Sequence, residues 1–449
     1  MAATQEETKK WEKEQKVHSH KLYDLAYRAT NQCIQCGYCL PSCPTYMSMG
    51  KESASPRGRI NLVKMAAEGK IDLSQDLSEP IDLCLGCRAC ETACPVNVPY
   101  GHILESAKDT IKEYEEDTKQ TTKAEGLKGI LLRQVFTRPG LMRAGGNATW
   151  LYQRTGLSNL VGKTNLLSKI SEPIGEIEKI LPSVEGPGKR VKRGKVLEPY
   201  KEKKATVAFF TGCVSEAVLN RTNRLTIELL RHIGCEVHIS NKQNCCGALH
   251  AHQGYSSISK DLAKENIKAF EETEADYIIN NAGGCGAILR EYDHLLKDDP
   301  DWKKRASRFS AASKDVSEIF VEIGPLPFKK KWKGRITYQP SCHLTNVQKV
   351  ASAPEELLSS IPGAEYIEME KSNECCASGG IYNLIHYEES MKILDKKMGY
   401  AKETTATTIA SSNPGCLLQM RLGIKRAGLE GKVQGVHLVD ILAESCGIE

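Results

Sequence analysis

Two cysteine runs near the start of the chain have the spacing of iron-sulfur ligands. Both follow the pattern C-x2-C-x2-C-x3-C-P, over residues 33–44 and 84–95. Cysteines three residues apart on a tightly turning backbone can reach three corners of a cubane, and Gly37 and Gly86 let that backbone approach a cluster closely. Soft thiolates favour iron-sulfur clusters over hard cations, whereas zinc sites more often show two separated cysteine pairs. The pattern predicts two ferredoxin-type [4Fe-4S] clusters.

The fourth cysteine of each run is expected to ligate the cluster of the other run. On this scheme the first cluster is held by Cys33, Cys36, Cys39 and Cys94. The second is held by Cys84, Cys87, Cys90 and Cys43. Crossed ligation of this kind makes the two clusters neighbours.

The spacer between the runs is expected to be helical. Residues 61–68 have helix-forming composition and are followed by Gly69. Arg57 and Arg59 stand just before this helix. We expect them in a solvated turn, with tempering of the cluster charge as the alternative.

The second half of the chain contains a duplicated cysteine pattern. The two copies are Cys213, Cys245, Cys246 and Cys285, and Cys342, Cys375, Cys376 and Cys416. Strand-like runs at 205–210, 236–240, 275–280, 335–338 and 407–411 alternate with helical segments at 223–232, 259–272 and 387–398. Alternation of this kind predicts two α/β lobes with parallel sheets, and cysteines at and beyond the strand ends should gather at one edge.

Adjacent cysteines constrain what the duplicated pattern can bind. Neighbouring side chains of extended backbone point in opposite directions, so two adjacent thiolates grip a single tetrahedral ion awkwardly. A multi-iron cluster accommodates them better; a zinc ion on three thiols and a redox-active thiol pair remain open. Cys235 and Cys446 lie outside the repeat and are expected to be buried core thiols.

Composition restricts the remaining classes. The 449 residues include 61 basic and 56 acidic side chains, a net charge of +5, which argues against a nucleic-acid partner. No apolar run reaches the length of a membrane span, and residues 1–21 are charged without a signal-peptide core, so a cytoplasmic location is expected. Eighteen cysteines in such a chain are better explained by metal ligation than by disulfides.

The segment between the two cysteine regions is expected to be a helical connector. A basic amphipathic stretch at 127–136 suits packing on its own domain, with peripheral contact at the cytoplasmic face of a membrane as the alternative. Residues 189–204 carry eight basic side chains and are expected to form an exposed linker. The Gly162-Lys163-Thr164 sequence is not a phosphate-binding loop because position 157 is leucine, and no dinucleotide fingerprint is present.

These observations together predict an α+β multidomain chain. We expect a helical two-cluster ferredoxin domain at 1–110, a helical connector with a basic linker at 111–204, and two cysteine-rich α/β lobes at 205–334 and 335–449.

The order of these motifs resembles the iron-sulfur subunit of glycolate oxidase over nearly the whole chain. Residues 244–252, 374–384 and 413–416 carry the most similar stretches. Related families are lactate-utilisation proteins, the small subunit of anaerobic glycerol-3-phosphate dehydrogenase, and heterodisulfide reductase. The spacing of the two runs also resembles the helical ferredoxin domains of succinate dehydrogenase and heterodisulfide reductase subunits.

The resemblance implies an electron-transfer subunit of a 2-hydroxy-acid dehydrogenase complex of glycolate or lactate type. A separate FAD-containing subunit would oxidise the substrate, and this chain, with no catalytic residues of its own, would pass electrons to quinone or another acceptor. His250, His252 and His343 lie beside the cysteine motifs and are expected to form local hydrogen bonds. Two alternatives stay open: a heterodisulfide-reductase-like subunit whose C-terminal repeats reduce a disulfide or quinone directly, and an assembly scaffold that holds zinc.

Two departures limit the resemblance. The repeat of heterodisulfide reductase has another cysteine three residues before its last one, where this chain has Ala282 and Asn413, so a noncubane cluster is not expected. Ala377 replaces the glycine of the second Cys-Cys-Gly motif, which costs stability if the backbone there has a positive φ; Gly379 and Gly380 could relieve that strain.

Overall fold

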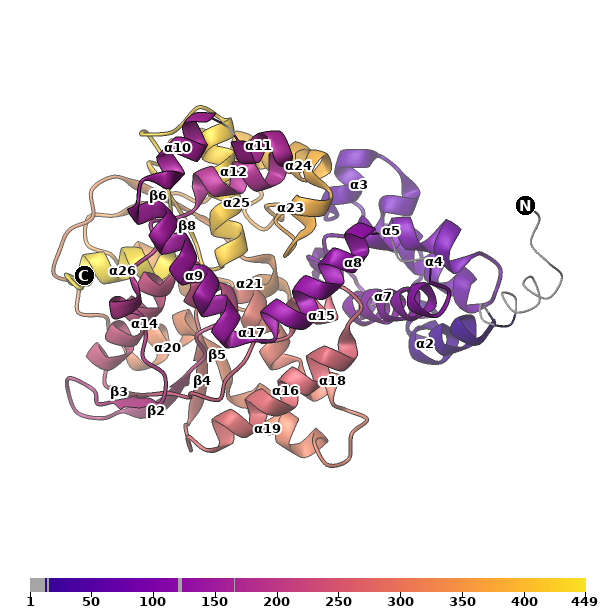
Figure 1. Ribbon diagram of the computed structural model, residues 1–449, viewed down its shortest axis with the longest axis horizontal. Coiled ribbons are helices and arrows are strands. Elements are labelled where there is room, and N and C mark those ends of the chain that lie inside the picture. The colour runs from indigo at the N-terminus through magenta and orange to yellow at the C-terminus, as the bar shows by residue number, and fades with distance from the viewer. Residues whose placement is uncertain (1–12, 14–15, 120–122, 165) are drawn as a thin grey trace. The chain divides into compact units, whose positions relative to one another are not determined.

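The computed structural model describes residues 13, 16–119, 123–164 and 166–449, which form two compact units (Figure 1). The first contains the described residues up to Leu132 together with Leu249–Ser259. The second contains Arg133–Ala248 and Lys260–Glu449. The charged N-terminal run at 1–21, which was expected to lack a signal-peptide core, lies mostly outside the described residues.

The first unit is helical. Its elements are η1 (Tyr23–Tyr27), α2 (Arg28–Thr30), α3 (Pro44–Met49), η2 (Glu52–Ala54), α4 (Pro56–Ala67), η3 (Leu73–Leu77), α5 (Ser78–Asp82), α6 (Ala89–Thr92), α7 (Tyr100–Asp117) and α8 (Lys123–Ile130). The apolar faces of α4 and α7 supply much of its core, including Ile60, Val63, Ile103 and Ala107. Cysteines of both runs pack in or against this small core, so the packing of the helices fixes the loops that carry the two runs.

Helix α4 corrects one expectation. It begins at Pro56, five residues before the predicted start, because Ser55 caps it by accepting a hydrogen bond from Gly58 N at 2.9 Å and Pro56 already has helical φ. Arg57 and Arg59 therefore lie in a helix and not in a turn. Arg59 is 1% exposed, so the prediction of a solvated arginine is wrong there.

The second unit contains two sheets. Their strands are β1 (Lys195–Leu197), β2 (Ala205–Phe209), β3 (Cys235–Ile239), β4 (Tyr277–Asn280) and β5 (Ser313–Asp315), followed by β6 (Arg335–Gln339), β7 (Glu365–Tyr366), β8 (Thr408–Ser411) and β9 (Gln434–His437). The orders are β1-β3-β2-β4-β5 and β7-β6-β8-β9. Every pairing is parallel except β1 with β3. The predicted parallel α/β character of this region is confirmed.

Helices cover these sheets and connect their strands. They are α9 (Pro139–Arg154), α10 (Leu157–Thr164), α11 (Leu166–Ile170), α12 (Glu172–Ile180), η5 (Pro187–Lys189), α13 (Cys213–Val218), α14 (Asn220–His232), α17 (Gly283–Arg290), α18 (Tyr292–Leu295), α19 (Lys303–Ala312), α20 (Val316–Ile323), α21 (Cys342–Asn346), α22 (Ser352–Ser359), α23 (Tyr382–Ile385), α24 (Tyr387–Glu403), α25 (Pro414–Arg426) and α26 (Leu438–Cys446). Three further helices, η4 (Leu131–Phe136), α15 (Ala248–Ala251) and α16 (Ser256–Glu271), have residues in both units.

The segment at 189–204, predicted to be an exposed linker, is largely exposed and also contains strand β1. Residues 195–197 pair with β3 in antiparallel register, with Val196 opposite His238. Lys195 and Val196 stay exposed in this strand, because an edge strand can pair its backbone while its side chains face solvent. The linker is therefore partly an edge strand of the first sheet.

One hydrophobic core joins the two repeats. It contains Val207 and Val237 from the first sheet, Ile336 and Ala410 from the second, and Leu442 from α26. Cys235 and Cys446 are both 0% exposed within it, and burial raises their thiol pKa values to about 11 and about 12. These two cysteines are core thiols, as expected.

Candidate metal centres

The two N-terminal cysteine runs share one backbone conformation. In the first, Gln35 and Gly37 have φ of 57° and 85°; in the second, Gly86 and Arg88 at the corresponding positions have φ of 63° and 58°. Left-handed residues on both sides of the second cysteine turn the chain sharply. The sequence indicates this need at one glycine of each run, but not at Gln35 and Arg88, where the structure alone reveals it.

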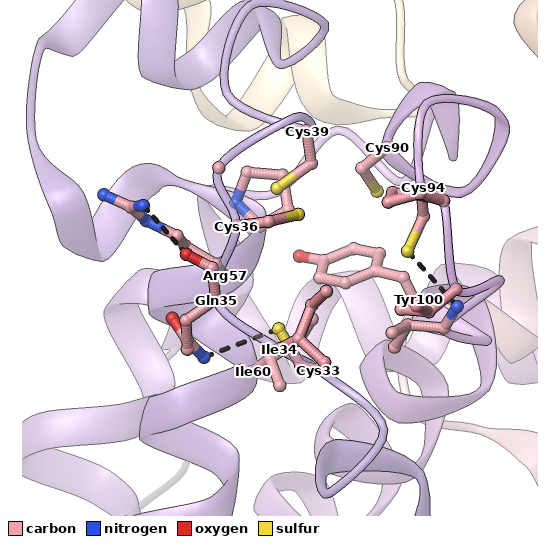
Figure 2. A pocket seen from close by; sticks show the side chains of 15 residues that line it. Cys33, Ile34, Gln35, Cys36, Cys39, Arg57, Ile60, Cys90, Cys94 and Tyr100 are labelled. Carbon is pink, nitrogen blue, oxygen red and sulfur yellow. Dashed lines mark hydrogen bonds between the residues drawn. The ribbon is translucent and has the colours of Figure 1, made fainter.

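The cysteines of the two runs line two cavities in crossed combination. The first cavity is lined by Cys33, Cys36, Cys39, Cys90 and Cys94 (Figure 2). The second is lined by Cys43, Cys84, Cys87 and Cys90. Each cavity thus receives three cysteines of one run and the last cysteine of the other, and Cys90 borders both. Thiols are the donor set that iron-sulfur clusters prefer, so the residues present fit such a group.

Hydrogen-bond donors are already directed at several of these sulfurs. Gly86 N lies 3.5 Å from Cys84 Sγ, and Val98 N lies 3.4 Å from Cys94 Sγ. Burial raises the pKa of the Cys39 and Cys90 thiols. These thiols therefore favour the protonated form unless a cation compensates the thiolate charge.

Tyr100 is a residue of this region that the sequence did not single out. It begins α7, is 3% exposed and borders both cavities. Its hydroxyl lies 3.3 Å from Cys84 Sγ, and burial raises its pKa well above the usual value. The phenol therefore stays protonated and can donate to sulfur. Its position five residues after a Cys-Pro pair is no recognised signal, which is why sequence reasoning missed it.

The first C-terminal quartet gathers where parallel strands end. Cys213 starts α13 directly after β2, Cys285 lies in the first turn of α17 after β4, and the adjacent pair follows β3. The Sγ atoms of Cys213 and Cys245 are 3.6 Å apart. Hydrogen bonding with Cys245 is the main cause that raises the pKa of both Cys213 and Cys246, and Cys246 also hydrogen-bonds Cys285. The four thiols therefore form a continuous chain, in which the adjacent thiols of Cys245 and Cys246 contact each other; the expectation that they point in opposite directions is wrong.

The second quartet repeats this order. Cys375 interacts with Cys342 and Cys376, and Cys376 interacts in turn with Cys416. Donation from Cys342 lowers the pKa of Cys375, whereas the hydrogen bond with Cys375 raises that of Cys376. Within the part of the chain that the structure describes, no three His, Cys, Asp or Glu side chains are arranged to hold a single metal ion. Eight thiols thus form two equivalent chains.

The residue that follows the adjacent cysteines has a positive φ in both repeats. Gly247 has φ of 88°, and Ala377, which replaces the glycine, has φ of 67°. Ala377 is fully buried; its N–H lies 3.4 Å from Cys375 Sγ, and its carbonyl accepts a bond from Ser390 Oγ at 2.9 Å. Packing around the turn therefore holds a strained alanine in place.

Asn413 joins the two repeats close to their last cysteines. Its Nδ2 lies 3.5 Å from Cys416 Sγ, and its Oδ1 accepts a bond from Gly284 N at 3.1 Å, next to Cys285. A second link runs from Gly283 N to Ser412 O at 3.0 Å. The N-termini of α17 and α25, each carrying a predicted ligand, are therefore neighbours in one unit.

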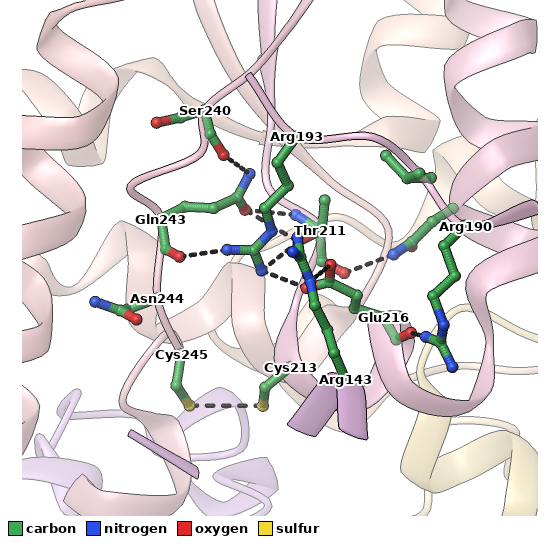
Figure 3. A network of polar contacts seen from close by, with 12 residues as sticks. Arg143, Arg190, Arg193, Thr211, Cys213, Glu216, Ser240, Gln243, Asn244 and Cys245 are labelled. Carbon is green, nitrogen blue, oxygen red and sulfur yellow. Dashed lines mark hydrogen bonds and ion pairs between the residues drawn. The ribbon is translucent and has the colours of Figure 1, made fainter. Parts of the chain in front are cut away.

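A buried polar network lies beside Cys213 (Figure 3). Glu216 in α13 contacts Arg143 Nε at 2.7 Å and also Arg193 Nη2. Arg193 Nη1 donates to Gln243 O at 2.7 Å, two residues before Cys245. Arg193, in the basic segment that precedes β2, thus connects the segments that carry Cys213 and Cys245. The sequence does not indicate this role, because the segment has the composition of a solvated linker.

The second quartet has a buried cation of its own. Lys397 in α24 is 1% exposed and donates to the carbonyl oxygens of Lys371 at 2.7 Å and Ser372 at 2.9 Å. Burial lowers its pKa to about 8. The two repeats therefore differ in the charge placed near their thiols, although their cysteine patterns match.

Two of the three histidines beside the motifs have local partners in the first unit. His250 Nε2 lies 3.0 Å from Leu132 O, and His252 Nδ1 lies 3.2 Å from Glu105 Oε1. His343 lies on α21 and lowers the pKa of Cys375 electrostatically, as a smaller contribution than the thiol hydrogen bonds.

Helices α9 and α10 in the second unit carry an exposed apolar and basic surface. Residues 133–171 include six Lys or Arg and no Asp or Glu. Leu141, Leu151, Leu157 and Leu160 are all exposed there. No described helix combines the length and apolar character that crossing a membrane requires.

Three family models match four stretches of the chain. Residues 29–98 match the 4Fe-4S dicluster domain, and residues 207–290 and 336–421 each match the cysteine-rich domain family. Residues 123–181 match the linker region of the glycolate oxidase iron-sulfur subunit. The two predicted cysteine regions and the connector between them therefore each correspond to a known family.

Two curated relatives match most of this chain, and a third matches about half of it. The probable glycolate oxidase iron-sulfur subunit of Bacillus subtilis is 46% identical, with 92% of this chain and 94% of the relative covered. The glycolate oxidase iron-sulfur subunit of Escherichia coli is 29% identical over 86% of this chain and 88% of the relative. Lactate utilization protein A of Oceanobacillus iheyensis is 35% identical over 53% of this chain and 96% of the relative.

Proposed function

The chain belongs to the family of glycolate oxidase iron-sulfur subunits, and on this premise we propose that it is the electron-relay subunit of a flavoprotein 2-hydroxy-acid dehydrogenase complex. An FAD-containing partner would oxidise a glycolate- or lactate-type substrate by two electrons. This chain would accept those electrons singly and deliver them to quinone or another acceptor. No residue of the chain is assigned to substrate oxidation.

The observation that carries the proposal is the pair of cavities bordered by crossed cysteine quartets. We assign Cys33, Cys36, Cys39 and Cys94 to one [4Fe-4S] cluster, and Cys84, Cys87, Cys90 and Cys43 to the other. When bound, each cluster supplies a one-electron couple. Buried apolar side chains such as Ile60 and Val98 line part of the first cavity, and the backbone N–H of Gly86 donates to a ligand sulfur of the second. Both effects tune the reduction potential.

The C-terminal quartets are proposed to hold further iron-sulfur clusters. In each repeat the adjacent thiols contact each other and one further thiol each, so four sulfurs lie together, and thiolates in such number suit an iron-sulfur cluster. Iron, sulfide and zinc analysis of the anaerobically reconstituted full chain distinguishes the possibilities. More than about eight irons per chain would favour clusters in the repeats, whereas about eight irons with stoichiometric zinc would favour the zinc alternative.

Peripheral membrane association at the cytoplasmic face is proposed for the α9–α10 surface. Exposed leucines with basic side chains and no acidic ones suit an interface with anionic lipid. Co-sedimentation with vesicles of anionic lipid should exceed that with neutral vesicles and should fall in Leu157→Ser/Leu160→Ser. Equal recovery with both vesicle types would argue for a soluble chain.

The relay is tested by rapid reduction. The reconstituted chain, mixed with its co-purifying flavoprotein and excess 2-hydroxy acid, should bleach at about 400 nm, where thiolate-ligated iron absorbs. Bleaching must require both the flavoprotein and the substrate. If the isolated chain instead turns over a reduced dye with a disulfide or quinone, the direct-reduction alternative replaces the relay.

A further inference from the structure

Three arginines border the two N-terminal cavities, and they differ in counter-charge. Arg57, beside the first cavity, pairs with Glu52 at 2.7 Å and is 30% exposed. Arg88, beside the second, pairs with Glu91 at 2.8 Å. Among the described residues, Arg59 has no carboxylate partner, although it borders the second cavity and is the most buried of the three.

The contacts of Arg59 leave part of its guanidinium unsatisfied. Nε donates to Pro80 O at 2.6 Å, and Nη1 donates to Thr45 Oγ1 at 3.1 Å. Nη2 is buried and has no hydrogen-bond partner in the described part of the chain. A buried cation without a counter-charge is strongly destabilising, so the site calls for an anion.

Arg59 lines the same cavity as the sulfurs of the second cysteine quartet, and these sulfurs attract its charge. Burial lowers the pKa of Arg59, but attraction to Cys84, Tyr100 and Cys43 outweighs it and raises the pKa overall. Lys108 is a second cation that interacts with Cys84, but Asp82 and Glu105 accompany it. The charge of Arg59 is therefore directed at the sulfurs of Cys84 and Cys43 and at the phenol of Tyr100, and no carboxylate of the described residues accompanies it.

We propose that Arg59 donates Nη2–H to the cluster held by Cys43, Cys84, Cys87 and Cys90, and makes it the more readily reduced of the two N-terminal clusters. Reduction adds one electron and no proton, so the extra negative charge is stabilised by a nearby, poorly screened cation. Arg57 has no comparable effect on the first cluster because Glu52 neutralises it and solvent screens it. Arg59 is a positioning and tuning residue for electron transfer. The inference rests on the two-cluster assignment proposed above.

The test is a redox titration of the reconstituted full chain followed by electron paramagnetic resonance. The electron donor is dithionite, with mediators. Arg59→Gln keeps hydrogen-bonding capacity without the charge and should make reduction of one cluster at least about tenfold less favourable, which is about 59 mV for a one-electron couple. Arg59→Lys retains the charge, so the reduction potential of that cluster should stay closer to the parent value than it does in Arg59→Gln. Arg57→Gln is the matched control. It should leave the equilibrium constant for reduction of each cluster within about threefold of the parent value.

A ligand variant assigns the signals without relying on Arg59. Cys84→Ser should alter or remove the signal of the higher-potential N-terminal cluster. If it alters the signal of the lower-potential cluster instead, the inference is overturned. This test holds even if the Arg59→Gln chain fails to bind iron. Arg59→Gln with the parent potentials also overturns it, as does Arg59→Lys with a loss as large as that of Arg59→Gln. Fewer than about eight irons in the parent chain would instead refute the two-cluster assignment itself.

Discussion

Replacing Arg193 with methionine removes one of two cationic partners from a buried carboxylate. The side chain of Glu216 is 4% exposed and contacts both Arg143 and Arg193. Arg193 is 8% exposed, whereas Arg143 is 38% exposed, so solvent screens the remaining pair more strongly. Removing one partner of a buried pair costs about 3–5 kcal/mol, and partial compensation by Arg143 places the expected loss of unfolding free energy near 3 kcal/mol.

A matched variant separates burial from the loss of charge itself. Arg221→Met removes the partner of Asp440, which lies 3.7 Å away, but the Arg221 side chain is 47% exposed, so the expected loss is below about 1 kcal/mol. Urea unfolding followed by circular dichroism gives both values. Similar losses in the two variants would refute the argument. The double variant Arg193→Met/Glu216→Gln should lose less unfolding free energy than the sum of the losses of its two single variants, because no unpaired charge is left buried.

Three further predictions concern other parts of the chain. Cys94→Ala should lower the iron content by about four atoms per chain, whereas the core variant Cys235→Ala should leave it unchanged; iron and sulfide analysis compares them. Gly247→Ala should lower the unfolding free energy by about 1 kcal/mol because φ there is 88°, while Ala377→Gly should not destabilise, as urea unfolding would show. Burial lowers the pKa of His437 to about 4, so the unfolded chain binds a proton that the folded chain does not. Stability should therefore fall as pH drops from about 6.5 towards 4, and His437→Gln should weaken that dependence; an equal dependence in both would count against the role of His437.

The cysteine groupings were accessible from sequence because they depend on local geometry. Spacings of three residues fix which sulfurs one turning loop can present, and the structure brings the two N-terminal runs to cavities in the crossed combination. The duplicated pattern is similar, since a cysteine just after a parallel strand lies at the carboxyl edge of its sheet. The four-part division expected from the sequence does not follow the two compact units. Residues 249–259 lie inside the first repeat but belong to the first unit.

The charged residues were not predictable in the same way. Arg59 and Arg193 both stand in basic, polar stretches that read as solvated, yet both are buried. Their partners are distant in sequence. Arg193 donates to the carbonyl of Gln243, 50 residues away, and Arg59 donates to the carbonyl of Pro80, 21 residues away. Composition cannot distinguish a solvated arginine from one enclosed by the packing of another segment.

By itself, the sequence determined the family, the iron-sulfur character and the parallel α/β character of the repeats. Each of these follows from residue types at short, fixed spacings. Only the tertiary structure decided which cations face which sulfurs, that Tyr100 borders both cavities, and that Asn413 joins the two repeats. These features depend on long-range packing, in which burial, and not sequence neighbourhood, sets the strength of a charge.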